Sequence, residues 1–227
     1  MPNISLKSSE DIYEELCSKI EKLEYMPGDG ISENELSKQY GVTRYIVRGA
    51  FTKLKERRLI EVYPQRGTFV SLIDIGYVED ILYLREAVEQ ESLRRVIRCE
   101  KEKRDEVAAK MKDLINRQQK AMEKDVKLED FYQADNEYHQ CMMTAIGKEH
   151  VMDLIKEQDI HVRRWRNFEV RDKERLKEII KDHQNIVEAI EHGEEKEGWE
   201  YLHVHLDTVG RLKQSFQNAQ KEYFIFR

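Results

Sequence analysis

The stretch from Ser32 to Val70, SENELSKQYGVTRYIVRGAFTKLKERRLIEVYPQRGTFV, changes from a helical to an extended pattern within one short segment. Ser32 followed by Glu35 forms a capping-box pattern, which predicts that a short helix begins there. Gly41 ends this helix, and Thr43 is the expected N-cap of a second one. The second helix has apolar residues at three- and four-residue spacing: Ile46, Val47, Ala50, Phe51 and Leu54. Two helices joined by a tight glycine turn predict a helix-turn-helix motif.

An extended pattern follows this motif. Ile60 and Val62 lie before the turn Pro64-Gln65-Arg66-Gly67, and the β-forming run Thr68–Val70 lies after it, which predicts a hairpin or wing. A glycine at the tip lets the backbone approach DNA while Arg66 reaches a phosphate or a narrow minor groove. The segment therefore predicts a winged helix-turn-helix.

Three residues of the second helix, Arg44, Tyr45 and Arg48, lie largely off its apolar stripe. In a helix-turn-helix the N-terminal residues of this helix face base edges in the major groove. Residues Lys38 to Arg66 carry eight Lys or Arg and two acids, so they hold a net +6 within a chain of net −6. Positive charge is concentrated where DNA would bind. The alternatives are that these arginines are ordinary surface residues, or that the winged helix contacts proteins.

The same residues resemble the GntR family of bacterial transcription regulators. The family pattern of a PGD turn, S-E-x-E-L, G-V-[ST]-R-x-x-V-R-x-A and a G-x-[FY]-V wing is found at Pro27–Asp29, Ser32–Leu36, Gly41–Ala50 and Gly67–Val70. The resemblance implies that Arg44 and Arg48 are recognition-helix arginines and that Gly67 is the wing-tip glycine. Asn34 stands where many members have a DNA-contacting arginine, and Gly49 replaces the usual glutamate. These two departures are expected to alter DNA contacts and to weaken the helix by about 1 kcal/mol relative to Ala, respectively.

Length and composition predict two domains, which we place at residues 1–74 and 75–227. The chain has 227 residues, of which 37% are charged and only three are proline, a composition typical of a helix-rich protein. No apolar run approaches the roughly 20 residues of a membrane span, and no signal peptide is evident. Three widely spaced cysteines fit reduced thiols. We therefore expect a cytoplasmic protein.

The remainder of the sequence predicts helices only. A first amphipathic helix runs from Ser9 to Pro27 and completes the core of the winged domain. From Tyr77 onward, apolar residues at helical spacing predict about six helices in an antiparallel bundle. The fourth of them is expected from about Val151 to Trp165, and the sixth from Trp199 to Phe216. The expected fold class is mainly α, with an N-terminal winged helix-turn-helix and a C-terminal all-α bundle.

All seven histidines lie between His139 and His205. Asp135 and His139 are four residues apart and so share a helix face, His183 lies on the apolar face of the fifth helix, and His205 lies on the sixth. One carboxylate and three imidazoles suit zinc, nickel, manganese or iron, with zinc favoured. Each histidine taken alone is more often a satisfied core or surface residue than a metal ligand.

The spacing also resembles the FCD subfamily, the FadR-like branch of GntR regulators. Its D-x-x-[FY]-H motif is found at Asp135–His139, its E-H-x-x-I-x-x-A-I motif at Asp182–Ile190 with Asp182 for Glu, and its closing H-L at His205-Leu206. The resemblance implies a metal held by Asp135, His139, His183 and His205, and a small carboxylate effector bound to it. A guanidinium would pair with that carboxylate; Arg85 is our first choice and Arg164 the second.

Together these patterns predict a homodimeric transcription regulator, expected to be a repressor, that binds double-stranded operator DNA and a small carboxylate effector. DNA contacts are expected from Asn34, Thr43, Arg44, Tyr45, Arg48, Arg66 and Gly67. Two other hypotheses remain open. One is a metal-dependent enzyme that acts on a small organic acid through the Asp/His site. The other is a set of structural histidines in a bundle that serves only for dimerisation.

Overall fold

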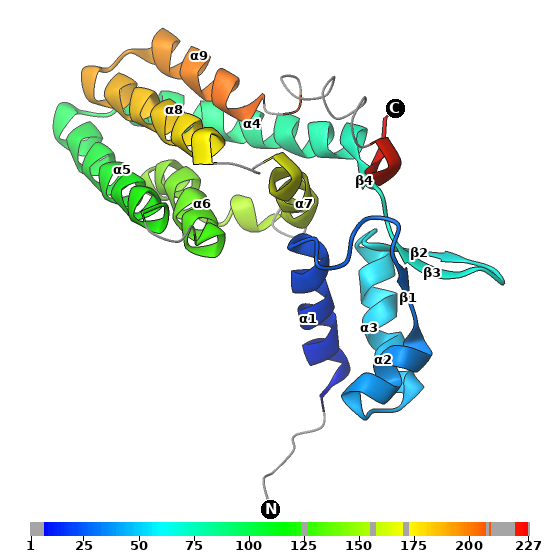
Figure 1. Ribbon diagram of the computed structural model, residues 1–227. Coiled ribbons are helices and arrows are strands. Elements are labelled where there is room, and N and C mark those ends of the chain that lie inside the picture. Colours follow the sequence, from blue (N-terminus) through cyan, green and yellow to red (C-terminus); the bar gives the residue numbers. More distant parts are fainter. Residues whose placement is uncertain are drawn as a thin grey trace, which may run out of the picture. The chain divides into compact units, whose positions relative to one another are not determined.

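The computed structural model describes residues 7–123, 127–154, 158–169, 173–207, 209 and 221–226 (Figure 1). The chain forms two compact units, and neither is continuous in sequence. Unit 1 contains Met1–Val78, Glu157–Phe168 and Gln214–Arg227. Unit 2 contains Glu79–Lys156 and Glu169–Lys213.

Unit 1 contains the predicted winged helix-turn-helix. A three-stranded antiparallel sheet has the order β1-β3-β2, and its β2–β3 hairpin is the wing, with Ile60 opposite Val70 and Tyr63 opposite Gly67. Apolar residues from the helices and the sheet form one buried core. The elements are α1 (Ser9–Glu21), β1 (Gly30–Ile31), α2 (Glu33–Tyr40), α3 (Arg44–Glu56), β2 (Ile60–Tyr63) and β3 (Gly67–Val70).

Local signals in the sequence set the helix boundaries. Ser32 is the N-cap of α2, and its hydroxyl accepts a hydrogen bond from the Glu35 amide at 3.4 Å. Gly41 ends α2 with φ of 65°, a left-handed conformation that glycine adopts without a steric penalty. Thr43 occupies the N-cap position of α3, but its side chain makes no capping hydrogen bond. A reciprocal capping box occurs instead at the start of α1, between Ser8 and Asp11.

Unit 1 also includes a helix from much later in the chain, α7 (Asp159–Glu169). Ile160 of α7 is part of the buried core of the winged helix. Near the end of the chain, η2 (Lys221–Tyr223) leads into β5 (Phe224–Ile225), which pairs in parallel with β4 (Ile73–Asp74). The sequence predicted a fourth bundle helix from Val151 to Trp165, whereas the structure has a short 3-10 turn, η1 (Met152–Leu154), followed by α7 in unit 1.

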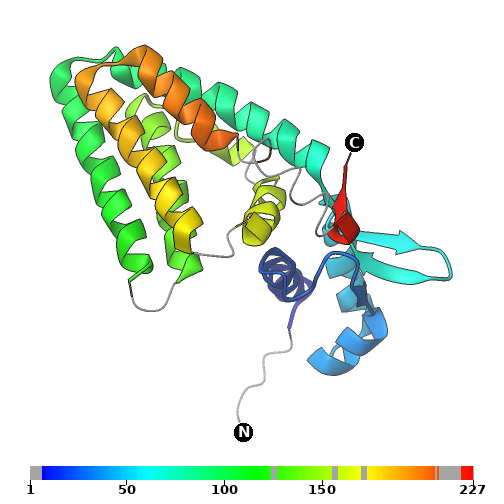
Figure 2. The ribbon, with the colours of Figure 1, turned by 45° about the horizontal axis from the view of Figure 1, so that its top comes forward.

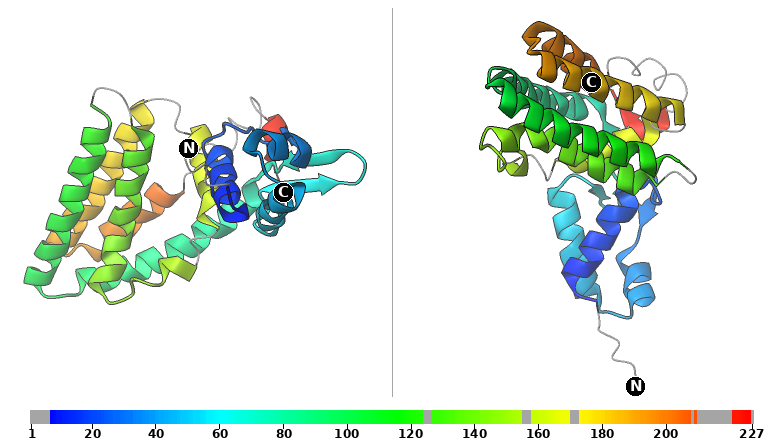
Figure 3. Two further views of the ribbon diagram at one scale, coloured as in Figure 1. Left: turned by 90° about the horizontal axis from the view of Figure 1, so that it is seen from below. Right: turned by 90° about the vertical axis from the view of Figure 1, so that its left-hand side faces the viewer.

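Unit 2 is a helical bundle, in which α5, α6 and α8 lie side by side and α9 lies along α8 (Figures 1 and 2). Figure 3 shows the same packing from two further directions. Its buried core includes apolar residues from all five helices. The predicted extension of the last helix to Phe216 lies outside the described residues. The helices are α4 (Ile75–Ile97, whose first residues belong to unit 1), α5 (Lys101–Ala121), α6 (Leu128–Ala145), α8 (Lys173–His192) and α9 (Glu195–Leu206).

Helix α9 packs closely because it has a glycine at the contact. A Cβ at Gly198 would lie 3.1 Å from Ile97 of α4 and 3.3 Å from Ala189 of α8. The absence of a side chain at Gly198 therefore lets α9 lie close to both α4 and α8. Within the described ranges, no helix is long and apolar enough to cross a membrane.

Candidate functional site

Seven predicted DNA-contacting residues lie on α2, at the N-cap of α3, on α3 and on the wing of unit 1, and we call them the recognition surface. Tyr45 on the first turn of α3 is 84% exposed, although a large aromatic side chain is normally buried. Arg44 and Arg48 are also exposed, while Val47 on the opposite face is buried. The set is Asn34, Thr43, Arg44, Tyr45, Arg48, Arg66 and Gly67, of which all are exposed.

One member of the recognition surface has an acidic partner in this structure. The Arg48 guanidinium donates to the Glu33 carboxylate, with Nη2 to Oε2 at 3.0 Å. Glu33 is the first residue of α2, so this ion pair links the two helices of the motif. Exposed ion pairs contribute little to stability, so this pair costs little to break.

The wing tip is a tight turn between β2 and β3. Gly67 has φ of 112°, and Gln65 has φ of 62°, so the turn uses two residues in the left-handed region. The Arg66 guanidinium lies 5.8 Å from the centre of the Tyr63 ring, which holds it near the tip. The tip therefore presents a cation on a tight turn.

Gly49, which replaces the usual glutamate, has a packing partner. A Cβ at this position would lie 2.5 Å from Ser9 Oγ and 3.3 Å from Ser9 Cβ. The absence of a side chain therefore lets the start of α1 lie directly on α3.

In unit 2 the four predicted metal ligands, Asp135, His139, His183 and His205, come together, and we call them the histidine cluster. They come from α6, α8 and α9, and all are at most 2% exposed. Nε2 of His205 lies 3.2 Å from Nε2 of His139 and 3.3 Å from Nε2 of His183. Asp135 Oδ1 lies 3.6 Å from His183 Nε2 and 3.9 Å from His139 Nε2. One potential ligand atom of each histidine lies within 4.8 Å of the other two.

Residues that the sequence did not single out orient these imidazoles. Glu89 of α4 lies 2.5 Å from His139 Nδ1, and Gln118 Oε1 of α5 lies 2.9 Å from His183 Nδ1. Gln118 also donates from its amide nitrogen to Asp135 Oδ1 at 3.3 Å. The Nδ1 atoms of His139 and His183 are thus each paired with an oxygen, and Nε2 is the ring nitrogen that lies toward the centre of the cluster.

Two further residues lie near these imidazoles. Tyr138 stacks on the His183 ring with centroids 3.9 Å apart, and its hydroxyl donates to the His183 carbonyl at 2.9 Å. Asp182 Oδ2 lies 3.6 Å from His205 Nδ1, on the side away from the cluster centre. Spacing could have found Tyr138, which immediately precedes His139. Glu89 and Gln118 lie on other helices and give no such signal.

The donor atoms fit a bound cation. Imidazole nitrogens of His139, His183 and His205 lie together in a buried space, with the Asp135 carboxylate beside them. Imidazole nitrogen and carboxylate oxygen are the ligand types that a divalent transition metal prefers. Tetrahedral bonds of about 2.1 Å give donor separations of about 3.4 Å, close to the separations between the His205 Nε2 atom and its two neighbours.

A buried ion pair lies beside the histidine cluster. Arg85 and Glu89, both on α4 and both at most 1% exposed, are joined by two contacts to Glu89 Oε1, at 3.1 Å from Nε and 3.0 Å from Nη2. Burial by itself raises the pKa of Glu89, but the charges of His139 and Arg85 outweigh this effect and hold the pKa at about 2. Glu89 is therefore ionised and accepts from both neighbours.

The second predicted effector-binding residue, Arg164, belongs to α7 and thus to unit 1. It is fully buried, and its Nη1 and Nη2 donate to Ser71 Oγ at 3.1 Å and to the Ser71 carbonyl at 2.5 Å. Burial lowers its pKa to about 10, so it remains charged at neutral pH. The structure thus places Arg85 beside the histidine cluster and Arg164 in a hydrogen-bond network of the winged-helix unit.

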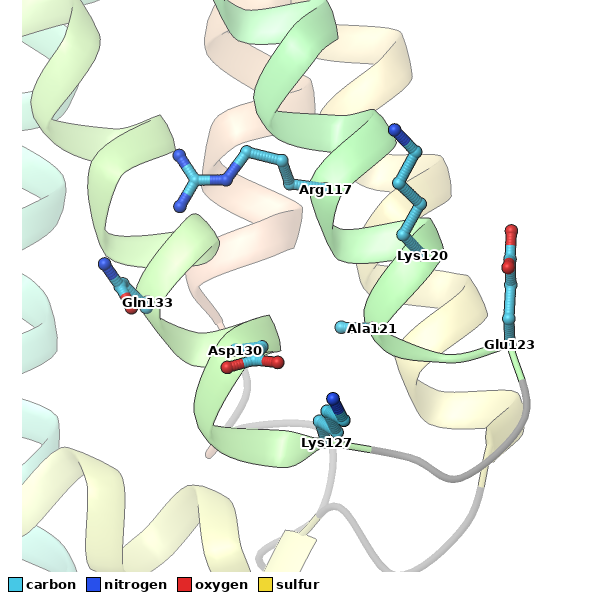
Figure 4. Close-up of a pocket in the computed structure, with 7 residues that line it drawn as sticks. All are labelled: Arg117, Lys120, Ala121, Glu123, Lys127, Asp130 and Gln133. Carbon is cyan, nitrogen blue, oxygen red and sulfur yellow. The ribbon is translucent and has the colours of Figure 1, made fainter.

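A surface pocket of about 560 Å³ lies where α5 ends and α6 begins (Figure 4). Figure 4 shows the Arg117 side chain reaching from α5 toward α6, where it forms an ion pair with Glu137. None of the residues that line this pocket belongs to the histidine cluster. They are Arg117, Lys120, Ala121, Glu123, Lys127, Asp130 and Gln133.

Comparison with known proteins identifies both parts of the chain. The sequence profile of the gntR family of bacterial regulatory proteins matches residues 8–70, and that of the FCD domain matches residues 80–208. An uncharacterized HTH-type transcriptional regulator from an unstable DNA locus of Streptomyces ambofaciens is 32% identical over 199 residues, which cover 88% of this chain and 82% of that protein. The HTH-type transcriptional repressor RspR of Escherichia coli K12 is 25% identical over 216 residues, or 95% and 93% of the two chains.

Solved structures share the fold. A GntR transcriptional regulator from Rhodococcus sp. RHA1 has a TM-score of 0.68 at 16% identity, over 93% of this chain and 98% of its own. Escherichia coli McbR/YncC has a TM-score of 0.63 at 17% identity, over 94% and 99%. At these identities the likeness concerns the fold alone. The relatives matched by sequence are transcription regulators. The chain belongs to the GntR family of bacterial regulators, as a DNA-binding transcription regulator with a C-terminal FCD domain.

Proposed function

We propose that this regulator is a homodimeric repressor whose affinity for its operator is controlled by a divalent metal and a small carboxylate effector in the FCD domain. The observation that supports the proposal is the histidine cluster, in which the Nε2 atoms of three buried imidazoles lie together and Asp135 Oδ1 lies 3.6 Å from that of His183. Zinc suits this donor set best, and nickel, manganese and iron are also compatible with it.

Asp135, His139, His183 and His205 would hold the metal, while Glu89 and Gln118 keep the Nδ1 protons of His139 and His183 away from it. A metal held there supplies a Lewis-acidic position for a carboxylate oxygen of the effector. We propose Arg85 as the charged partner of that carboxylate, because it lies beside the cluster and its ion pair with Glu89 orients its guanidinium. Arg164 is not part of this proposal, since its hydrogen bonds are in unit 1.

On the DNA side, Arg44, Tyr45 and Arg48 would enter the major groove, while Arg66 and Gly67 of the wing would contact the backbone or the minor groove. Asn34 and Thr43 lie at the edges of the same surface. Two copies related by a two-fold axis would read a near-palindromic operator. A repressor role is proposed because the relative RspR carries that description.

A three-part experiment tests this proposal on the full-length protein. Selection from a random DNA library should yield a near-palindromic operator, and elemental analysis after gentle purification should give close to one divalent metal per chain. A thermal-shift screen of sugar acids, hydroxy acids, amino acids and fatty acyl compounds should then identify a carboxylate that stabilises the metal-loaded protein. Absence of metal together with no response to added zinc would refute the metal-dependent part, and a reporter gene that the regulator activates would refute repression.

A further inference from the structure

Side chains of helix α7 donate hydrogen bonds to backbone carbonyls at the C-terminal ends of two helices of the winged-helix unit. The last carbonyl groups of any helix lack partners within that helix and must be satisfied by other donors. At the end of α3, the recognition helix, the carbonyl of the C-cap residue Arg57 accepts a hydrogen bond from His161 Nε2 at 2.9 Å. At the end of α1, the Glu21 carbonyl accepts from Asn167 Nδ2 at 2.6 Å. Both donors belong to α7.

A second route connects α7 to the same end of α3. Arg164 donates to the hydroxyl and the carbonyl of Ser71, and the Ser71 hydroxyl in turn donates to the Arg58 carbonyl at 2.7 Å. Arg58 follows the C-cap and has φ of 56°, an uncommon conformation for a residue that is not glycine. The carbonyls of two consecutive residues, Arg57 and Arg58, are thus held by α7, one directly and one through Ser71.

The groups that make these contacts have little freedom. Arg164 is fully buried and His161 is 6% exposed, while Ile160 on the same helix lies in the core of the winged helix. Burial and the neighbouring Arg164 charge lower the pKa of His161 to about 4, so the ring is neutral near pH 7 and Nε2 carries the proton that Arg57 accepts. The Tyr77 ring packs edge-on against His161. A displacement of α7 would therefore break or strain several bonds at the end of α3 together.

In the chain, α7 lies between two helices that carry residues of the histidine cluster. The helix that precedes it in sequence, α6, carries Asp135 and His139, and the helix that follows it, α8, carries His183. Three of the four residues of the histidine cluster therefore lie on the two helices that flank α7 along the chain. A shift of α6 or α8 on metal binding would reach α7 along the chain, because α7 follows α6 and precedes α8.

We propose that α7 is the positioning element through which the metal site controls the recognition helix, α3. His161 and Arg164 are the residues of α7 that connect it to the end of α3, through the Arg57 carbonyl and through Ser71. The proposal rests on the proposed function, because it takes the histidine cluster to be the regulatory site. It does not require α7 to touch DNA or metal.

The test compares His161→Phe, which keeps a ring and removes the donor, with His161→Gln, which keeps an amide donor. His150→Phe is the matched control, since His150 is 88% exposed at its side chain and lies outside these contacts. Each protein is loaded with zinc or depleted with EDTA, its metal content and melting curve are recorded, and its operator affinity is measured in both states. We expect zinc to change the operator affinity of the wild type, the Gln variant and the control about 5-fold or more. The operator affinity of the Phe variant should change less than about 2-fold, although its zinc content is the same.

A measurement on the wild type alone covers the case in which His161→Phe does not fold. Hydrogen exchange with and without zinc should show altered protection in α7 and at residues 54–59, with α2 as the internal reference. If the wild type responds to zinc and the Phe variant responds equally, or if the exchange changes are confined to α6, α8 and α9, α7 is not the positioning element. If the wild type binds no zinc, the proposed metal site is itself wrong, and so is the proposed coupling of that site to α3 through α7.

Discussion

The recognition surface and the histidine cluster put polar side chains in opposite surroundings. The recognition surface is a set of exposed residues that come from one segment, 34–67. The histidine cluster is fully buried, and its four ligands come from three helices spread over residues 135–205. An exposed cation needs no partner until DNA arrives, whereas buried imidazoles and a carboxylate need their partners in the folded protein itself. Substitutions in the histidine cluster should therefore change metal binding and stability, whereas substitutions in the recognition surface should change DNA affinity.

The largest effect should come from removing a ligand of the histidine cluster. His183→Ala should abolish tight metal binding. At a free metal concentration about 1,000 times the dissociation constant, metal should raise the free energy of unfolding of the wild type by about 4 kcal/mol and leave that of the variant nearly unchanged. Denaturant unfolding with and without metal measures this difference. His203→Ala is the control, because His203 is an exposed histidine that pairs with Glu86. Equal stabilisation of the variant and the wild type would contradict the metal site.

The next largest effect should be a loss of stability at acid pH that depends on His161 of unit 1. Its pKa is about 4 in the folded protein against 6.5 for the free side chain, so between these values the unfolded chain binds a proton that the folded chain does not. The free energy of unfolding should therefore fall as the pH drops from about 6.5 to 4, by up to about 3 kcal/mol from this group. Denaturant unfolding at a series of pH values should show a shallower decline for His161→Gln than for His150→Gln. Identical slopes would show that His161 does not set the acid stability of unit 1.

A smaller effect is expected on DNA binding from the recognition surface. Arg44→Ala should weaken operator binding by about 1 to 3 kcal/mol, the range for loss of a base contact, and weaken binding to random DNA much less. Fluorescence anisotropy with operator and scrambled duplexes at one salt concentration measures both. Arg95→Ala is a control that removes an exposed arginine from unit 2. The unfolding free energy should stay within about 0.5 kcal/mol of the wild type, because Arg44 is exposed. An equal loss of affinity for both duplexes would indicate that Arg44 contacts a phosphate and not a base.

The smallest effect should be found at Gly49, where the recognition helix meets α1. Alanine in a helix is favoured over glycine by about 1 kcal/mol, but the new Cβ would displace the Ser9 hydroxyl. Gly49→Ala should therefore be more favourable in a Ser9→Ala background than in the wild type, by an interaction energy of about 0.5 to 1 kcal/mol. Urea unfolding of the four proteins of this double-mutant cycle gives the value. Strict additivity would mean that the contact with Ser9 does not constrain residue 49.

The sequence predicted local features well and long-range partners poorly. The turn at Gly41, the glycine at the wing tip and the exposed face of α3 follow from short-range spacing, and the structure has each of them. Thr43 was expected to cap α3 with its side chain and does not. The partners of His161 could not be predicted, because Arg57 and His161 are separated by 104 positions.

By itself, the sequence determined the winged helix-turn-helix, the helical nature of the rest of the chain and the residue types suited to a metal. These features depend on helical and strand periodicity, on turn residues and on motifs a few residues long. Only the tertiary structure decided that Glu89 and Gln118 orient the imidazoles and that α7 packs into the winged-helix unit. These outcomes depend on which buried surfaces and hydrogen-bond donors meet across distant segments, and an amphipathic pattern specifies that a face is buried without specifying its partner.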